Sequence, residues 1–209
     1  MINTEEEARA FTARHCDVLA MERLALLAEE LEKEAPLQNL VAKNSLPQKW
    51  VRHIADSVQL AGFAEVGASP WIDLGSGAGF PGLVIAAIRP QQSVILVESR
   101  AKRIEWLERM ADKMGLSNCK VEGRRLELVE TFEAGVISAR AFAPLDKLLR
   151  LSARFSTSDT RWVLPKGRSA SQEVEALPQS QRGMFHVEQS LTDPLAGIIV
   201  GQGKWSAAR

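Results

Sequence analysis

The sequence predicts an α/β protein in which a mostly parallel β-sheet is flanked by helices and preceded by a helical N-terminal extension. After residue 67, short apolar runs alternate with stretches of helical periodicity, which is typical of a parallel sheet with crossover helices. Before that point only helical periodicity occurs. We therefore expect a helical extension over residues 1–66, packed on an α/β domain over residues 67–209.

The extension is expected to contain three helices. The first begins at Thr4, which forms a capping-box pattern with Glu7 three residues later. The second covers residues 17–33, where leucines recur at helical spacing and glutamates fill the remaining positions. The third covers residues 47–61 and has Pro47 in its first turn, where a missing N–H costs nothing.

The α/β domain is expected to alternate strands with helices. Strands are expected at residues 71–74, 93–97, 118–121, 136–138 and 161–164, and helices at residues 81–88, 100–114, 144–155 and 169–177. Ser169 and Gln172 form a second capping-box pattern at the start of the last helix. Residues 183–189 and 195–200 follow with no helix between them, so we expect an antiparallel pair that closes one edge of the sheet. Trp50, Trp106 and Trp162 are expected in the core.

The composition indicates an ordinary globular protein of a reducing compartment. Of the residues, 45% are hydrophobic and 25% are charged. The two cysteines, Cys16 and Cys119, lie far apart and lack the spacing of metal ligands. The N-terminus is acidic where a secretory signal is basic, and no apolar run is long enough to span a membrane. We therefore expect a cytoplasmic protein with no metal ion and no membrane contact.

The most informative stretch runs from Asp73 to Gly82 and joins the end of a strand to the start of a helix. Ligands bind at this carboxyl edge in open α/β folds. Its alternating glycines, Gly75, Gly77 and Gly79, allow a sharp turn and a close approach of backbone to ligand. Residues 77–82 also match the GxGxxG pattern of dinucleotide sites, a weak signal by itself.

Two carboxylates bear on which cofactor this loop binds. Asp73 directly precedes the glycines, where its charge would repel a pyrophosphate and suit the ammonium group of S-adenosylmethionine. Glu98, at the end of the second strand, suits the ribose hydroxyls of either cofactor. The residues alone favour S-adenosylmethionine and leave a nicotinamide dinucleotide open.

Several stretches together resemble the bacterial 16S rRNA guanine-N7 methyltransferase family, known as RsmG or glucose-inhibited division protein B. They are residues 39–41, 52–57, 73–82, 98–103, 138–141 and 164–168, within a resemblance that covers about residues 37–200. The resemblance implies a Rossmann-like class I S-adenosylmethionine-dependent methyltransferase fold, and a guanine in the decoding-region loop of small-subunit rRNA as the methyl acceptor. It also implies cofactor contacts at Gly75, Phe80, Leu126, Glu127 and Arg140.

The implied chemistry needs few special residues. Guanine N7 carries a lone pair and no proton, so its methylation requires neither a general base nor a cysteine nucleophile. Arg140 could bind guanine, a phosphate or the cofactor, or form an ion pair with Asp73 or Glu98. His53 and Asp56, three residues apart on one helical face, could pair with each other, pack between domains, or line the acceptor pocket.

Basic residues are the candidates for RNA contact. Residues 1–35 hold nine acidic and four basic residues, so the rest of the chain is mildly basic, which permits a polyanionic partner without requiring one. We select Lys166, Arg168, Arg100 and Arg103 as candidate phosphate contacts. We expect a monomer that acts on 16S rRNA or the small ribosomal subunit. The alternatives are a methyltransferase for a small molecule or a protein, and a nucleotide-binding module without turnover.

Overall fold

A computed structural model describes residues 1–206 and contains one seven-stranded sheet of order β3-β2-β1-β4-β5-β7-β6. The strands are β1 (Trp71–Leu74), β2 (Val94–Val97), β3 (Cys119–Glu122), β4 (Val136–Ser138), β5 (Arg161–Lys166), β6 (Phe185–Gln189) and β7 (Gly197–Gln202). The first five are parallel, and β7 lies antiparallel between β5 and β6. The predicted parallel sheet with an antiparallel edge is confirmed.

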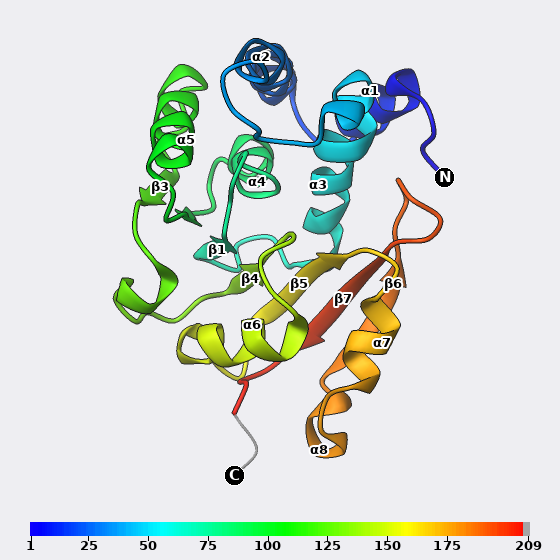
Figure 1. Ribbon diagram of the computed structural model, residues 1–209, viewed down its shortest axis with the longest axis vertical. Helices are drawn as coiled ribbons and strands as arrows, with labels where there is room; N and C mark the ends of the chain where they lie inside the picture. The colour runs from blue at the N-terminus through cyan, green and yellow to red at the C-terminus, as the bar shows by residue number, and fades with distance from the viewer. Residues whose placement is uncertain (207–209) are drawn as a thin grey trace.

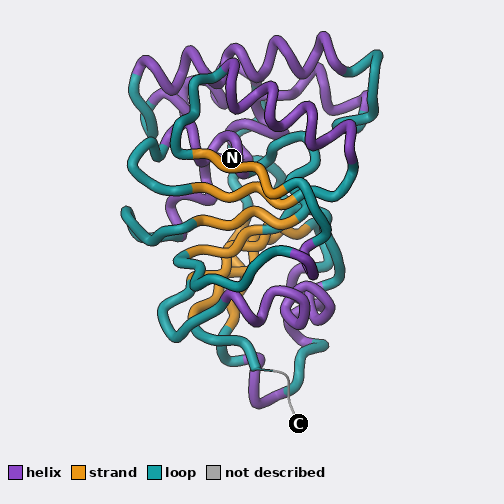
Figure 2. The backbone as a smooth tube through the Cα atoms, turned by 90° about the vertical axis from the view of Figure 1, so that its left-hand side faces the viewer, coloured by secondary structure: helices purple, strands orange, loops and turns teal. Residues whose placement is uncertain are grey.

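Helices cover both faces of the sheet, which explains the continuous apolar runs of the central strands (Figure 1). On one face lie α4 (Gly82–Ile88) and α5 (Ala101–Lys113), together with α2 (Val18–Glu34). On the other lie α6 (Leu145–Ser152) and α7 (Ala170–Glu175), followed by the short α8 (Gln179–Arg182). In Figure 2 the strands run side by side between these two sets of helices. The three tryptophans expected in the core are fully buried.

The N-terminal extension packs on α4 and shares its hydrophobic core. It comprises α1 (Glu5–Ala13), α2, the 3-10 helix η1 (Lys43–Gln48), the π-helical η2 (Trp50–Ala55), α3 (Asp56–Val58) and the 3-10 helix η3 (Gln59–Phe63). The expected third helix is present, but it begins at Trp50, so Pro47 lies in the preceding turn. The Glu5 carboxylate accepts hydrogen bonds from the backbone N–H groups of Trp50 and Val51 and thereby caps this start.

One predicted capping box is confirmed and the other is wrong. Thr4 accepts from the backbone N–H of Glu7, whose carboxylate accepts from the N–H of Thr4. Ser169 makes no such bond and instead donates to the Glu173 carboxylate at 2.7 Å. That carboxylate is held in place by Lys166 and by the N–H of Leu145, so it is available to the Ser169 hydroxyl.

The connection between β6 and β7 lies beside the helical extension (Figure 1). The N–H of Leu191 donates to the Gln59 side chain, and the N–H of Ile2 donates to the carbonyl of Leu191. Arg52 forms an ion pair with Asp193 at 3.0 Å. These contacts bring residues 190–196 against η2 and the start of η3, and they define one wall of the site. Among residues 1–206, no helix is both long and apolar enough to cross a membrane.

Candidate active site

The glycine loop after β1 has the conformation that the sequence predicted. Gly75, Gly77 and Gly79 adopt positive φ angles of 68°, 57° and 96°, which strain residues that have a Cβ atom. The N–H groups of Gly75 and Ser76 both donate to the carbonyl of Val97, so the loop is fixed to the end of β2. The turn therefore needs its glycines for backbone shape.

Asp73 anchors the glycine loop through its buried carboxylate. Its carboxylate accepts hydrogen bonds from the Ser138 hydroxyl at 2.8 Å and from the N–H of Gly82 at 3.2 Å, which joins β1 to β4 and α4. Burial raises the pKa of Asp73 to about 6. The side chain is fully buried in this conformation. A direct contact with the ammonium group of a cofactor stays a prediction.

Glu98 offers a fixed carboxylate beside Gly77. One oxygen accepts from the N–H groups of Ser99 and Arg100, and Oε2 accepts from the N–H of Gly77 at 3.1 Å. A carboxylate oxygen can accept a second bond, so Oε2 remains able to take a ribose hydroxyl. A Cβ atom on Gly77 would lie 3.3 Å from Arg103 Nη1, the end of a flexible side chain. Arg103 Nη1 also lies 3.9 Å from Glu98 Oε2. A carboxylate with a free acceptor position beside a glycine turn fits the ribose of S-adenosylmethionine.

The two remaining cofactor candidates after β3 lie in the 3-10 turn η4 (Leu126–Leu128). Leu126 is buried in the same apolar cluster as Val97 at the end of β2, whereas the Glu127 side chain is exposed. Leu126 is thus close to the edge that carries Glu98. Its role as a cofactor contact, with that of Glu127, stays a prediction.

An open cavity of about 1050 Å³ adjoins the loop after β4. Its walls come from η1 and η2, the loop after β4, the end of β5, and the β6–β7 connection. His53, Asp56 and Arg140 all line it. The structure therefore brings together the three residues that the sequence proposed for the acceptor side.

Arg140 and His53 form a hydrogen-bonded cluster over Phe80. Arg140 Nη1 donates to His53 Nδ1 at 3.2 Å, and the His53 ring stacks on Phe80 with centroids 5.1 Å apart. Since arginine can only donate, Nδ1 must accept, and the ring proton is on Nε2, which lies 2.8 Å from Ser45 Oγ. The Ser45 hydroxyl in turn donates to the carbonyl of Ala42. Burial, with the charges of Arg140 and Arg52, lowers the pKa of His53 to about 3, so His53 is neutral at pH 7.

Asp56 is the ionic partner of Arg140. Oδ2 of Asp56 lies 3.7 Å from Nη1 of Arg140. Oδ1 accepts from Thr192 at 2.7 Å and from Gln59 at 2.9 Å. Burial raises the pKa of Asp56, and the Arg140 charge opposes that rise. Across residues 1–206, neither Asp73 nor Glu98 forms an ion pair with Arg140. His53 and Asp56 do not pair with each other, because each of them contacts the Arg140 guanidinium instead.

The four candidate RNA contacts do not form one patch. Arg100 and Arg103 lie near the end of β2, whereas Lys166 and Arg168 lie near the end of β5, three strands away. The Lys166 side chain is only 9% exposed, and it donates to Glu173 at 2.9 Å and to the carbonyl of Ala143 at 2.7 Å. Arg168 and Arg100 are exposed.

Sequence reasoning missed several residues of the cavity. Ser45 orients His53, while Gln59 and Thr192 hold Asp56. These are polar residues of helices and loops without a motif, so only their distance in space reveals the connection. Within the described part of the chain, no group of three or more acidic, histidine or cysteine side chains could hold a metal ion.

The fold and this site define a class I S-adenosylmethionine-dependent methyltransferase. The glycine loop follows β1 and Arg140 follows β4, so the site lies at the point where the strand order reverses. A SAM dependent methyltransferase from Aquifex aeolicus has a similar fold, with a TM-score of 0.57 at 13% identity over 75% of this chain and 92% of that one.

The chain belongs to the rRNA small subunit methyltransferase G family, whose family model, GidB, matches residues 20–193. The protein named ribosomal RNA small subunit methyltransferase G from Erythrobacter litoralis is 59% identical over 98% of this chain and 99% of its own length. Its namesake from Novosphingobium aromaticivorans is 56% identical over 95% of this chain and 88% of its own length. These findings favour an rRNA methyltransferase over an enzyme for a small molecule or a protein.

Proposed function

We propose that this protein transfers the methyl group of S-adenosylmethionine to N7 of a guanine in 16S rRNA, with the guanine held in the cavity beside the glycine loop. The observation that carries the proposal is the junction between that loop and the cavity. Phe80 ends the loop, and the Arg140 guanidinium lies over its ring, 5.2 Å from the centroid. A base in the cavity would therefore meet a cofactor bound along the loop.

The cofactor supplies an electrophilic methyl group on a sulfonium. On the protein side, Glu98 would accept hydrogen bonds from the ribose hydroxyls, and the glycine loop would admit the methionine portion. Phe80 and Leu126 would form the apolar walls of the cofactor site. Asp73 keeps the loop in shape through its bonds to Ser138 and Gly82. The exposed Glu127 contributes through its backbone.

The acceptor side positions the base and moves no proton. With S-adenosylmethionine bound, the cavity would have to hold guanine N7 in line with the methyl group and the sulfur, and no side chain would need to take up a proton. Alignment of such reactants can supply about 7–11 kcal/mol of the barrier. A neutral His53, with its pKa near 3, fits a reaction that needs no base.

The RNA is proposed to cross the mouth of the cavity. Arg168, Arg100 and Arg103 contact its phosphates, whereas the buried Lys166 orders the loop at Ala143. The extension of residues 1–66 supplies one wall of the cavity and the domain of residues 67–209 supplies the others. The protein acts as a monomer in the cytoplasm, where ribosomal RNA is its substrate.

A methyl-transfer assay tests the proposal. The protein is incubated with isotope-labelled S-adenosylmethionine and, in parallel, small ribosomal subunits, deproteinised 16S rRNA, or a small-molecule extract. Mass spectrometry of the digested RNA should find labelled 7-methylguanosine at one position. Label that appears on another nucleoside, or only in the extract, would refute the proposed acceptor.

A further inference from the structure

A hydrogen-bond donor and an acceptor face the cavity side by side without bonding to each other. Arg140 Nη1 and Asp56 Oδ2 are 3.7 Å apart, beyond hydrogen-bond range, and their side chains are 24% and 20% exposed. The two side chains carry opposite charges and lie next to each other. Their capacity for a ligand lies in Asp56 Oδ2 and in the N–H groups that Arg140 carries on Nη2 and Nε, because both N–H groups of Nη1 already have partners.

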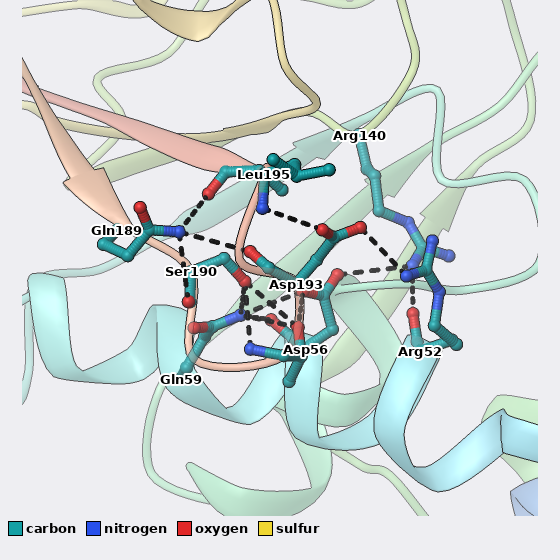
Figure 3. Close-up of polar contacts among 10 residues, drawn as sticks. Arg52, Asp56, Gln59, Arg140, Gln189, Ser190, Asp193 and Leu195 are labelled. Carbon is teal, nitrogen blue, oxygen red and sulfur yellow. Dashed lines mark hydrogen bonds and ion pairs between the residues drawn. The ribbon is translucent and has the colours of Figure 1, made fainter. Parts of the chain in front are cut away.

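The Asp56 carboxylate is held in one orientation. Thr192 and Gln59 donate to Oδ1, and Gln59 is itself fixed by the N–H of Leu191, which donates to its side-chain oxygen at 2.8 Å. Figure 3 shows Gln59 and Ser190 on one side of Asp56, with Arg52 and Arg140 on the other. Because the network occupies Oδ1, the oxygen left for a ligand is Oδ2.

The Arg140 guanidinium is also fixed and only partly used. Nη1 donates to His53 Nδ1 at 3.2 Å and to the carbonyl of Arg52 at 3.3 Å. The guanidinium also packs against the face of the Phe80 ring. In the part of the chain that the structure describes, both recorded hydrogen bonds use Nη1, so the N–H groups on Nη2 and Nε remain available.

We propose that Arg140 and Asp56 select guanine by reading its Watson–Crick edge: Arg140 donates to O6, and Asp56 Oδ2 accepts from N1–H and the 2-amino group. This inference rests on the proposed function, in which a base enters the cavity. Adenine has an amino donor in place of O6 and an acceptor at N1, so it opposes both protein groups. Recognition through this edge leaves N7 free.

The same pair affects the chemical step. As N7 forms its bond to the methyl carbon, positive charge passes from the sulfonium to the guanine ring. A fixed carboxylate at N1–H stabilises that charge, and more strongly in the transition state than in the bound substrate. Loss of Asp56 should therefore lower kcat as well as raise KM.

The test compares acceptor bases in the wild type and in Asp56→Asn. Small subunits are reconstituted with guanosine or 2-aminopurine riboside at the acceptor position. The latter keeps N7 and the 2-amino group but lacks O6 and has an acceptor at N1. The wild type should prefer guanosine by more than about a hundredfold in kcat/KM, as expected from two lost bonds to charged groups. In Asp56→Asn, the amide oxygen meets the donors of Thr192 and Gln59, and its NH2 group faces the cavity. The preference should fall to about tenfold or less, because this donor opposes N1–H and suits an N1 acceptor.

A matched variant separates base selection from folding. Thr160→Val removes a buried hydrogen bond to the carbonyl of Ala134, before β5 and away from the cavity, so it should lower Tm while the ratio of guanosine to 2-aminopurine stays at the wild-type value. Unchanged S-adenosylmethionine affinity checks the fold of Asp56→Asn. A folded Asp56→Asn that keeps the wild-type ratio overturns this inference. A wild type that makes no 7-methylguanosine overturns the proposed function instead.

Discussion

The cofactor edge and the acceptor cavity lie next to each other but are built in opposite ways. Residues 73–82 and Glu98 form the cofactor edge, where both carboxylates bond to backbone N–H groups and glycine torsions set the shape. The cavity is lined by side chains from four separate segments, and its central charges keep unused hydrogen-bonding capacity. In the proposed function, backbone shape would therefore determine binding of a cofactor common to many enzymes, whereas side chains would select the particular acceptor.

Replacement of Arg140 should give the largest difference between the effect on methyl transfer and the effect on cofactor binding. Arg140→Met leaves Asp56 in the cavity without its cation, and loss of one partner of such a pair costs about 2–5 kcal/mol, or roughly thirtyfold or more in rate. Single-turnover methyl transfer should fall accordingly, while calorimetry should find S-adenosylmethionine affinity unchanged. Arg150→Met, at an exposed pair with Asp146, is the control. An equal loss of cofactor affinity would assign Arg140 to the cofactor edge, the role that the family resemblance implied.

Acid should weaken the cavity through His53. Its folded-state pKa of about 3 lies below the ordinary value of 6.5, so the unfolded state binds more protons between these values. The stabilisation is fully present above pH 6.5 and is lost progressively toward pH 3. From pH 6.5 to 5 the loss is on the order of 2 kcal/mol.

Denaturant unfolding at each pH should therefore show a flatter profile for His53→Gln than for the wild type. Parallel profiles for wild type and His53→Gln would mean that folding does not change the pKa of His53.

A methyl group at Gly75 should disturb the cofactor edge at its border with the cavity, which Phe142 lines. In Gly75→Ala the new Cβ atom would lie 2.5 Å from Phe142 Cδ2, at a φ of 68°. The left-handed conformation alone costs about 1–2 kcal/mol, which corresponds to about tenfold in cofactor affinity if the loop shifts to relieve it. Gly62→Ala introduces the same atom into open space and should change nothing. Calorimetry that finds equal affinities for the two variants would contradict the assignment of this loop.

The smallest effect is expected at the rim of the cavity. Arg168→Ala should reduce the salt dependence of binding to small subunits by about one phosphate contact. Lys166→Ala should instead lower the free energy of unfolding, since it leaves Glu173 without its partner, and should keep the salt slope. If the two variants exchanged these effects, Lys166 would be the RNA contact.

The sequence was most informative where the relevant residues are close together in the chain. The strand, glycine loop and helix were predicted because their signals are contiguous, and Thr4 caps its helix within three residues. The Ser169 cap was predicted wrongly because the Glu173 carboxylate, held by Lys166, takes its hydroxyl. The start of η2 depends on Glu5, 45 residues earlier, and no local pattern reports that contact.

The sequence named three residues that line the cavity but could not predict how they are arranged there. Resemblance to a known family indicated His53, Asp56 and Arg140, yet their mutual geometry depends on partners such as Thr192, which lies 136 residues from Asp56. A threonine in a loop has no distinctive sequence signal, and its importance comes from tertiary packing.

The dependence of the cavity on the β6–β7 connection sets an order of events during synthesis of the chain. All residues of the cofactor edge have been made once Glu98 has been added, and Arg140 follows soon after. Thr192 and Asp193, which orient Asp56 and Arg52, are added much later. In the proposed function, a growing chain would therefore hold most of the residues for donor binding before it could complete the wall that receives the acceptor base.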